Sequence, residues 1–275
     1  MKVIDPLHED KKLVDHLDGS VTKVLIFAWH GLGDIIMLQA PLNKLRFMYP
    51  QVQFDLALAL GLGQEDICKD ALLVTGDEAS DFSSERFAEY DLVCKIHMPM
   101  NEGQIEFTKG EWSCKHEIGI DPVSGHREPD VIKNRLVGCH FQITCLPDSA
   151  NVPYDVAKQV WEEIKQAGFI PIETLMKHVF HNPVNEKYDF IDRDVRDVLP
   201  KVSTLAGLIK SCGAFICGVS GNFHVAMSVL PPERIMLLEK DFLAPSFTKE
   251  TIGRIDVKDY IEGSIYTWLR KIDNE

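Results

Sequence analysis

Two short segments of the chain carry residue types that bind anions and accept protons, each directly after an apolar run. In the first, the apolar residues 23–29 (KVLIFAW) run into HGLGD, residues 30–34. In the second, residues 214–219 (AFICGV) run into SGNFH, residues 220–224. Glycine in such loops lets the backbone come close to a ligand, and apolar residues resume at helical spacing after each loop. Both segments therefore predict a buried strand, a tight loop and the N-terminus of a helix.

The second loop has the chemistry of an anion site. Ser220 and Gly221 fall where a new helix presents N–H groups without partners, and such an end suits a phosphate or a carboxylate. Asn222 and His224 follow directly, and His224 is a further candidate donor. The alternative is an ordinary joint between a strand and a helix, with His224 as a core histidine whose ring nitrogens are satisfied.

The first loop adds a carboxylate. Asp34 falls at the expected start of its helix, where the helix dipole favours a negative charge, and a carboxylate in such a loop can accept a proton from a hydroxyl. Gly31 and Gly33 let this loop approach a ligand on its own side of the protein. The alternative is that Asp34 is a simple helix N-cap. Because GLGD lacks the third glycine of the dinucleotide-binding fingerprint, a Rossmann-type cofactor is not indicated.

Glu173 is a further candidate, at the expected carboxyl end of a strand in the second half of the chain. An acidic residue in this place could hydrogen-bond the ribose of a nucleotide, as acidic residues do in related folds, and the alternative is a solvated carboxylate. His178 and His181 are three residues apart, but no third ligand is evident nearby, which favours a surface loop over a metal site. We therefore expect no metal.

The elements that must position these residues alternate between strand and helix. In the first half, apolar or alternating runs predict strands at residues 23–29, 53–60, 72–75 and 91–97. A helix between the first two is indicated by the spacing of Ile35, Leu38, Leu42 and Leu45, and Pro41 should kink it near its middle. Residues 1–20 are expected to be a surface lead-in. Residues 101–129 are expected to be an irregular surface excursion or, alternatively, the lining of an acceptor site.

The second half repeats the pattern. Strands are predicted at residues 136–143, 169–172, 214–219 and 234–239, with helices over 156–167 and 205–212. The tail, residues 257–272, has the spacing of an amphipathic helix, which we expect to lie back across the first half. The sequence thus predicts an α/β protein with one domain over residues 1–130, a second over 131–255 and a returning helix over 256–275. Ligands should bind outside the carboxyl ends of the strands.

Composition limits the class of protein. The chain has 275 residues, of which 45% are hydrophobic and 26% charged, enough for one large core or two moderate ones. Its net charge of -13 disfavours a nucleic-acid partner, because such partners need clustered Lys and Arg. No apolar run has the length of a membrane span, and the acidic start MKVIDPLHEDKK is unlike a signal peptide, so we expect a cytoplasmic protein. The 7 cysteines include no CxxC pair, which predicts reduced and mostly buried thiols.

The two loops also carry a resemblance to a known family. The segment KVLIFAWHGLGDIIMLQAPLNKLRFMYPQVQFDL resembles the opening of the glycosyltransferase family 9 enzymes, the heptosyltransferases, in which a strand runs into a Gly-Asp helix start. The segment TLAGLIKSCGAFICGVSGNFHVA is similar to the donor-site segment of the same family. Both matches occur in the family's order along the chain.

The resemblance implies a GT-B fold, in which two Rossmann-like domains face a cleft with the acceptor on the N-terminal side and a nucleotide-sugar donor on the other. It implies an inverting transfer to the hydroxyl of a saccharide or glycolipid. Asp34 matches the aspartate proposed as general base, whereas Ser220, Gly221 and His224 match donor-binding positions. The amides from Ser220 to Asn222, with His224, would stabilise the departing diphosphate without a metal.

The sequence departs from the family pattern at several positions, which keeps other functions open. Val219 stands where the family has Asp, Pro41 comes one residue later than expected, and residues 144–153 (TCLPDSANVP) lack the family's basic residue and Trp-Pro. One alternative is another GT-B-like enzyme, such as a nucleotide-sugar epimerase or a glycosyltransferase acting on a nucleic-acid base. A second alternative is a sugar or nucleotide binder without turnover.

Overall fold

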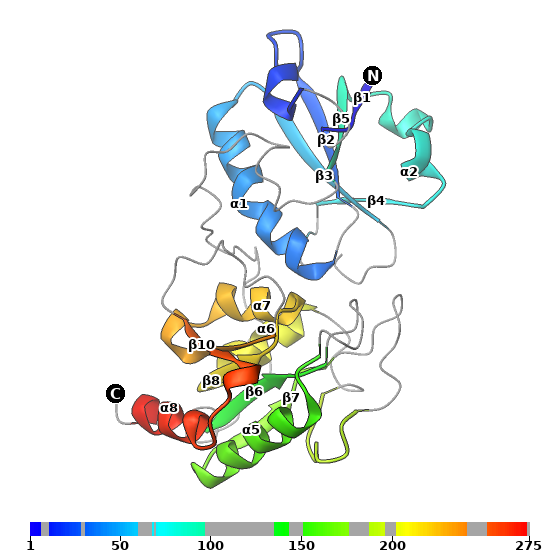
Figure 1. Cartoon of the computed structure of the whole chain (residues 1–275). Helices are drawn as coiled ribbons and strands as arrows, with labels where there is room; N and C mark the ends of the chain where they lie inside the picture. Colours follow the sequence, from blue (N-terminus) through cyan, green and yellow to red (C-terminus); the bar gives the residue numbers. More distant parts are fainter. Residues whose placement is uncertain are drawn as a thin grey trace. The chain divides into compact units, whose positions relative to one another are not determined.

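A computed structural model describes most of the chain outside one long central segment. The described residues are 1–6, 11–28, 31–59, 68, 70–96, 135–142, 151–175, 187–195, 202–240 and 252–273, and the side chains of Asp34, Met37 and Ala40 are not among them. The chain divides into two compact units, residues 1–119 and 120–275 (Figure 1). This division lies within residues 97–134, outside the described residues. The segment 101–129, expected to be a surface excursion or the lining of an acceptor site, lies outside them as well.

The first unit is a parallel five-stranded sheet with its strands in the order β1-β5-β2-β3-β4. Its elements are β1 (Lys2–Ile4), a 3-10 helix (Leu13–His16), β2 (Lys23–Ala28), α1 (Leu32–Met48), β3 (Gln53–Ala59), β4 (Leu72–Val74), α2 (Glu78–Asp81), a 3-10 helix (Glu85–Phe87) and β5 (Leu92–Ile96). The four strands expected from the apolar runs are all present. The helix α1 continues through Pro41 as one element.

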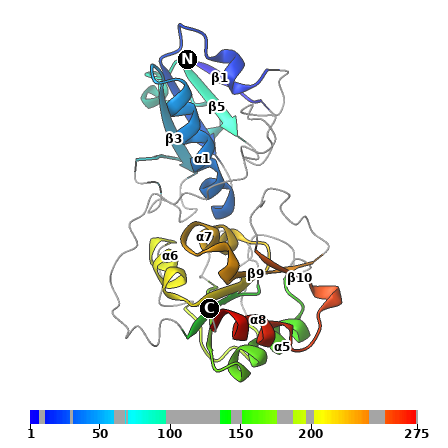
Figure 2. The ribbon, with the colours of Figure 1, turned by 90° about the vertical axis from the view of Figure 1, so that its left-hand side faces the viewer.

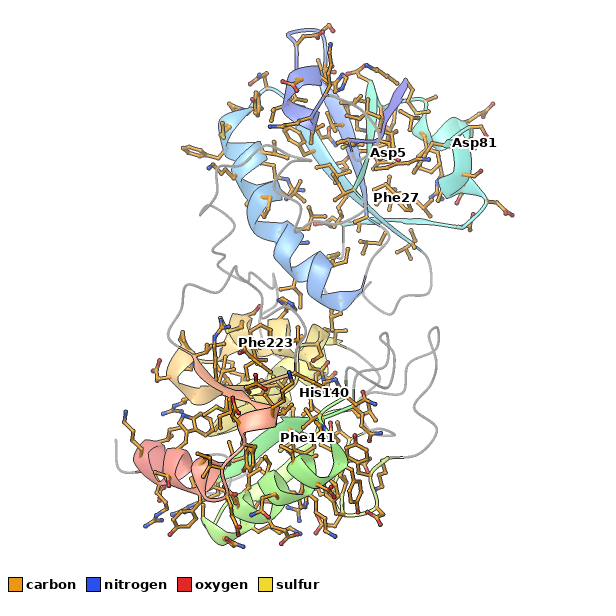
Figure 3. The ribbon with its side chains drawn as sticks, in the orientation of Figure 1. Asp5, Phe27, Asp81, His140, Phe141 and Phe223 are labelled. Carbon is orange, nitrogen blue, oxygen red and sulfur yellow. The ribbon has the colours of Figure 1, made fainter. Side chains whose placement is uncertain are left out.

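Alternation along the strands sends side chains to both faces of this sheet. Leu25, Phe27 and Val93 lie on the face that packs against Phe82 and Phe87, next to α2 (Figure 3). The phenylalanine rings of this cluster meet edge to face, with centroids 5.2 Å apart for Phe27 and Phe82. The face formed by Val24, Ile26 and Ala28, which have no exposed surface, is the one left for α1.

Residues 1–20 are more than the surface lead-in that the sequence predicted. Lys2, Val3 and Ile4 form β1, which pairs in parallel with Leu92, Val93 and Cys94 of β5. Ile4 and Leu13 have no exposed surface. Lys2–Ile4 and Leu13 therefore belong to the sheet and core of the first unit.

The second unit is also a parallel five-stranded sheet, in the order β10-β9-β8-β6-β7. Its elements are β6 (Leu136–His140), α5 (Tyr154–Gln166), β7 (Ile170–Glu173), α6 (Val202–Ser211), β8 (Ala214–Cys217), α7 (Gly221–Val229), a 3-10 helix (Pro232–Arg234), β9 (Ile235–Glu239), β10 (Gly253–Asp256), a 3-10 helix (Val257–Asp259) and α8 (Ser264–Asp273). The edge strand β10 was not predicted from the sequence.

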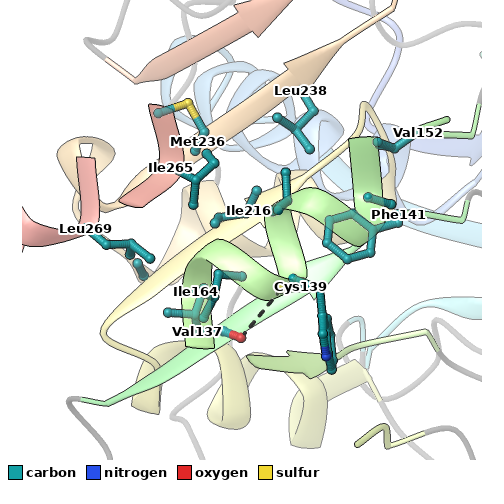
Figure 4. Packing of buried hydrophobic residues seen from close by; sticks show 14 of the residues in the cluster. Val137, Cys139, Phe141, Val152, Ile164, Ile216, Met236, Leu238, Ile265 and Leu269 are labelled. Carbon is teal, nitrogen blue, oxygen red and sulfur yellow. Dashed lines mark hydrogen bonds between the residues drawn. The ribbon is translucent and has the colours of Figure 1, made fainter. Parts of the chain in front are cut away.

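Helices cover both faces of this sheet. On one face α5 and α8 pack together, and on the other α6 packs against α7 (Figure 1). The core between the sheet and α5 contains strand residues such as Val137, Cys139 and Ile216 together with Trp161 and Ile164 of the helix (Figure 4). The 5 described cysteines are free thiols, and 4 of them are buried, in agreement with the predicted reduced state.

The closing helix α8 packs within the second unit and does not lie across the first, which corrects the expectation from the sequence. Ile265 and Leu269, both without exposed surface, join the core cluster beneath α5, and the two helices lie side by side (Figure 1 and Figure 2). Glu163 of α5, 1% exposed, accepts hydrogen bonds from the backbone N–H groups of Gly263, Ile265 and Tyr266 at 2.8, 3.0 and 3.1 Å. A carboxylate from another helix thus satisfies the N-terminus of α8.

No helix within the described ranges is long and apolar enough to cross a membrane.

Candidate functional site

Each sheet has one point at which the strand order reverses, and these points select the ligand-binding edges. In the second unit β6 is followed by β7 on one side and by β8 on the other, so the reversal falls between β6 and β8. In the first unit β3 and β4 follow β2 on one side while β5 pairs with its other edge. Ligands of parallel α/β sheets bind outside the carboxyl ends of the strands at such points. The loops after β8 and β2 are those that the sequence singled out.

The loop after β8 leads directly into α7. Ser220 is the N-cap, with extended backbone, and its hydroxyl accepts a hydrogen bond of 3.4 Å from the N–H of Phe223. Gly221 is the first helical residue and Asn222 the second. A nine-residue helix with a capped first turn presents its remaining N–H groups and the positive end of its dipole at this edge. This arrangement can bind a phosphate.

A buried polar cluster links the first turn of α7 to the ends of β6 and β7. The side-chain amide of Asn222, 8% exposed, donates to the carbonyl of Thr174 at 2.9 Å and to its hydroxyl oxygen at 3.1 Å. The Thr174 hydroxyl in turn donates to the carbonyl of Cys139 at 2.9 Å. His140, the last residue of β6, is labelled in Figure 3. Its Nδ1 lies 3.3 Å from the Asn222 amide nitrogen.

Glu173 closes this cluster from the end of β7. It has no exposed surface, and its carboxylate lies 3.3 Å from His140 Nδ1 and accepts a hydrogen bond of 3.3 Å from the N–H of Phe141. Burial raises the pKa of this carboxyl, while the hydrogen bond and charge of His140 oppose the rise. A ribose hydroxyl that donates a hydrogen bond to Glu173, as expected from the sequence, does not fit a fully buried side chain, and neither does the alternative of a solvated carboxylate.

The remaining donor-side candidate is buried as well. His224 is the fourth residue of α7 and is 5% exposed, and its ring lies 5.2 Å from that of Phe223, measured between centroids. Both expectations for His224, a donor to a ligand and a core histidine with satisfied ring nitrogens, stay predictions. Val219, where the family has Asp, is half-buried in the loop between β8 and α7.

In the first unit, the structure places the HGLGD loop at the start of α1. Gly31 is the N-cap, with no side-chain hydrogen bond, and Gly33 is the second helical residue. Asp34 is therefore the third residue of α1 and not the N-cap, although its side chain lies outside the described residues. A carboxylate at this position still lies within the favourable end of the helix dipole.

One strand edge thus brings together four residues that were candidates from the sequence, Ser220, Gly221, Asn222 and Glu173. His140 and Thr174, which lie beside them, were not predicted. The available signal for His140 was a histidine ending the apolar run LVGCH. That signal is weak, because the contact depends on β6 and β7 pairing in the register that sets Cys139 against Glu173.

The described residues contain no group of three or more side chains placed to hold a metal ion. An Asp-x-Asp pattern, which can bind metals, does occur at Asp192 and Asp194. The carboxylate of Asp192 pairs with Lys165 at 3.1 Å and that of Asp194 with Lys187 at 2.5 Å. His178 and His181 lie outside the described residues.

Similarity to known proteins is found in the structure rather than in the sequence. No protein-family model and no curated protein matches the chain. A family 9 glycosyltransferase of Veillonella parvula DSM 2008 matches with a TM-score of 0.56 and 14% identity over 85% of this chain and 85% of that one. The ADP-heptose lps heptosyltransferase II of E. coli matches with a TM-score of 0.60 and 12% identity over 91% and 98% of the two chains.

A third match adds a bound ligand. The dodecameric, iron-containing heptosyltransferase TibC, of enterotoxigenic E. coli H10407, was solved with ADP-D-β-D-heptose and matches with a TM-score of 0.58 and 12% identity over 92% of this chain and 75% of that one. The two parallel α/β units, each with its reversal point, agree with these matches. The expected α/β fold of GT-B type is confirmed, and the chain shares the fold of the family 9 glycosyltransferases.

Proposed function

We propose that this chain is a glycosyltransferase that moves a sugar from a nucleotide-activated donor to an acceptor hydroxyl. The observation that carries the proposal is the start of α7. Its capped first turn follows β8 at the reversal point of the second sheet, in a fold shared with enzymes that bind ADP-heptose. A helix N-terminus at that edge is suited to the diphosphate of such a donor.

In this proposal the donor diphosphate binds at Ser220, Gly221 and the N–H groups that follow. These groups are fixed before the reaction, because Ser220 caps the turn and Asn222 fastens it to Thr174. Donors held in place in this way can stabilise the charge that develops on the leaving diphosphate, without reorganisation during the reaction. His224, the fourth residue of α7, is a further donor to the diphosphate in this proposal.

The chemical step in the proposal is inverting, with Asp34 as the general base. Asp34 stands in the first turn of α1 and follows β2 at the reversal point of the first sheet. A carboxylate there can remove the proton of the acceptor hydroxyl as the bond to the sugar forms. Gly31 and Gly33 keep side chains away from the approaching acceptor.

We further propose that the transfer needs no metal ion. The α7 amides can take the part that a metal plays for a leaving diphosphate, and both carboxylates of the Asp192 and Asp194 pair are engaged by lysines. TibC is described as iron-containing, so this part of the proposal requires its own test. Turnover that is unchanged in EDTA supports it, and turnover restored only by an added metal contradicts it.

The proposed acceptor is a saccharide or glycolipid, and the proposed location is the cytoplasm, where nucleotide sugars are available. The net charge of -13 makes a nucleic-acid acceptor an unfavourable partner.

A second candidate function is nucleotide or nucleotide-sugar binding without turnover. Val219 favours it, because this residue directly precedes the N-cap of α7 and has no polar group with which to hold a sugar hydroxyl.

The test has two stages, which separate the two functions. Thermal unfolding is first measured with ADP, UDP and GDP and with ADP-heptose. A true donor at 100 times its Kd should add about 2.7 kcal/mol of apparent stability. Release of the nucleoside diphosphate is then followed with saccharide acceptors present. Binding with release supports a glycosyltransferase, binding alone supports the second candidate, and no binding contradicts both.

A further inference from the structure

A lysine follows β9 at the same edge of the second sheet as the start of α7, and the function proposed above gives it no role. Lys240 is half-buried and comes directly after Glu239, the last residue of β9. The strand β9 pairs in parallel with β8, the strand that leads into α7. Because the carboxyl ends of parallel strands meet at one edge of a sheet, Lys240 lies at the edge where a ligand is expected.

The register of the two strands brings Lys240 next to the first turn of α7. Cys217, the last residue of β8, pairs with Leu237 of β9. Three residues further along the chain from this pair come Ser220, the N-cap of α7, and Lys240. Neighbouring strands lie about 5 Å apart, a separation that the flexible four-carbon stem of a lysine can cross.

The ammonium group of Lys240 is not engaged by a carboxylate in the described part of the chain. Lys240 makes no hydrogen bond or ion pair with another described residue, and Glu239 beside it pairs instead with Arg254 at 2.7 Å. The protein has a net charge of -13, so acidic partners are plentiful elsewhere. A half-buried positive charge is unfavourable without a partner, and this one remains available to a ligand.

The start of α7 needs a positive charge if it binds a diphosphate. Each phosphate group is negatively charged at neutral pH, whereas a helix N-terminus supplies only about half a positive charge. Residues 136–142, 170–175 and 214–229, which form the ends of β6, β7 and β8 and all of α7, contain no lysine or arginine. Residues 144–153 also lack the basic residue of the family 9 pattern.

The alternation of side chains along β9 places Lys240 on the other side of this edge from α7. Met236 and Leu238 belong to the core beneath α5 (Figure 4), and Lys240 follows at the next position of the same alternation. The helix α7 packs with α6 on the opposite face of the sheet. Groups from the two faces can contact one ligand at the shared edge from two sides.

We propose that the ammonium group of Lys240 binds the diphosphate of the donor at the first turn of α7 and supplies the positive charge that the neighbouring segments lack. This inference rests on the proposed function and adds a binding residue to its site. Lysine binds phosphates as a point charge, and a positive charge placed at the leaving diphosphate also stabilises the charge that develops there during transfer.

The experiment measures, by calorimetry, the affinity for whichever of ADP, UDP and GDP the wild type binds most tightly. Lys240→Met keeps the length of the side chain without its charge and should weaken binding about 10- to 100-fold, the range for losing a hydrogen bond to a charged group. Lys240→Arg keeps the charge and should retain most of the affinity. The matched control is Lys210→Met, at the exposed end of α6 that precedes the amino end of β8, and should not change the affinity.

The salt dependence separates a charge contact from a change of shape. Salt screens the attraction between an ammonium group and a phosphate, so the advantage of the wild type over Lys240→Met should shrink as NaCl is raised from about 0.05 M to about 1 M. All other charges are common to both proteins. Without nucleotide the two proteins should melt at the same temperature, because Lys240 has no partner to lose among the described residues.

Several results would overturn the inference. Full affinity in Lys240→Met, or a difference that salt does not reduce, would show that Lys240 is not the cation, while the proposed function stands. Equal losses in Lys240→Met and Lys240→Arg would assign the effect to shape, and an equal loss in Lys210→Met would assign it to overall charge. If Lys240→Met does not fold, Lys240→Gln replaces it with the same expected loss, and full affinity there overturns the inference. A wild type that binds none of the three nucleotides removes the proposed function as well.

Discussion

The two units hold their strands together with polar side chains at opposite edges. In the first unit Asp91 accepts hydrogen bonds from Thr22 N–H, the Thr22 hydroxyl and Lys23 N–H at 2.8, 2.8 and 3.0 Å, and so joins the amino ends of β2 and β5. In the second unit Glu173 and Asn222 join carboxyl ends. Ligands of parallel sheets bind at the carboxyl ends of the strands, so only the residues Glu173 and Asn222 lie at an edge where a ligand is expected.

The two carboxylates are also in opposite environments. Asp91 is exposed, and its hydrogen bonds with Thr22 and Lys23 lower its pKa. Glu173 is buried, and burial raises its pKa. The difference indicates that a polar anchor on the amino edge can be solvated and purely structural, whereas one on the carboxyl edge is removed from water and perturbed, as functional groups often are.

The largest expected effect tests whether the carboxyl edge of the first unit is functional too. Asp34→Asn should slow sugar transfer about 10²- to 10⁴-fold, because asparagine cannot accept the acceptor's proton. The melting temperature should change little, since Gly31, and not Asp34, is the N-cap of α1. Release of the nucleoside diphosphate and thermal unfolding are measured on the same samples. Normal turnover in this variant would make the first loop a structural joint.

The next largest effect is expected for Glu163, a buried carboxylate of α5 that does not lie at the carboxyl ends of the strands. Glu163→Ala should lower the free energy of unfolding by about 2–3 kcal/mol, because three backbone N–H groups of the α8 segment lose their acceptor. Glu162→Ala on the same helix is the matched control, since Glu162 is 47% exposed, and should change stability by less than about 0.5 kcal/mol. The free energy of unfolding of both variants is measured in urea. Equal losses of stability in the two variants would show that the buried hydrogen bonds of Glu163 do not stabilise the protein.

A smaller effect tests the donor site directly. Gly221→Val should weaken nucleoside diphosphate binding about 10-fold, because a branched side chain at the first position of α7 enters the path of the phosphates. Gly19→Val is the control, because a Cβ at Gly19 meets nothing within 4 Å. Calorimetry with ADP measures both. Wild-type affinity in Gly221→Val places the phosphates elsewhere.

The smallest effect belongs to the amino edge. Asp91→Asn should lower the melting temperature less than Glu163→Ala does, and turnover should not change. Since folding lowers the pKa of Asp91 below its ordinary value of 3.8, its contribution is complete at neutral pH and is lost as pH falls below that value through the folded pKa. Melting temperatures of the wild type and the variant should therefore converge on acidification below pH 4, and a constant difference at every pH would contradict this account.

Much of the fold was predictable because its central strands are apolar and its helices periodic. The apolar runs 23–29 and 214–219 predict β2 and β8 from the local sequence alone, because a buried strand of a parallel sheet needs apolar residues on both faces. The edge strands β1 and β10 were missed, since KVI and GRID are short and partly polar and become strands only through pairing with β5 and β9. The helix α8 was predicted, but an amphipathic pattern does not say which surface the apolar face covers.

The site was half predictable for a similar reason. Ser220 and Gly221 follow a local rule, in which a strand, a small-residue loop and a helix appear in order. The proximity of His140 to Glu173 depends on strand register, and the backbone of residues 193–195 pairs with Glu173 from a distant part of the sequence. Neither feature can be predicted from the local sequence around these residues.

The acceptor role of Glu163 also sets the order in which the two units can form during synthesis. Its partners lie 100 to 103 positions further along the chain, and Leu269 supplies part of the same core. All five described strands of the first unit have been made once Ile96 has emerged, whereas the second unit leaves a charged group and an apolar helix face uncovered until α8 has been made. Contacts this distant in sequence form slowly, so the newly made second unit is the part of the protein most exposed to misfolding and aggregation.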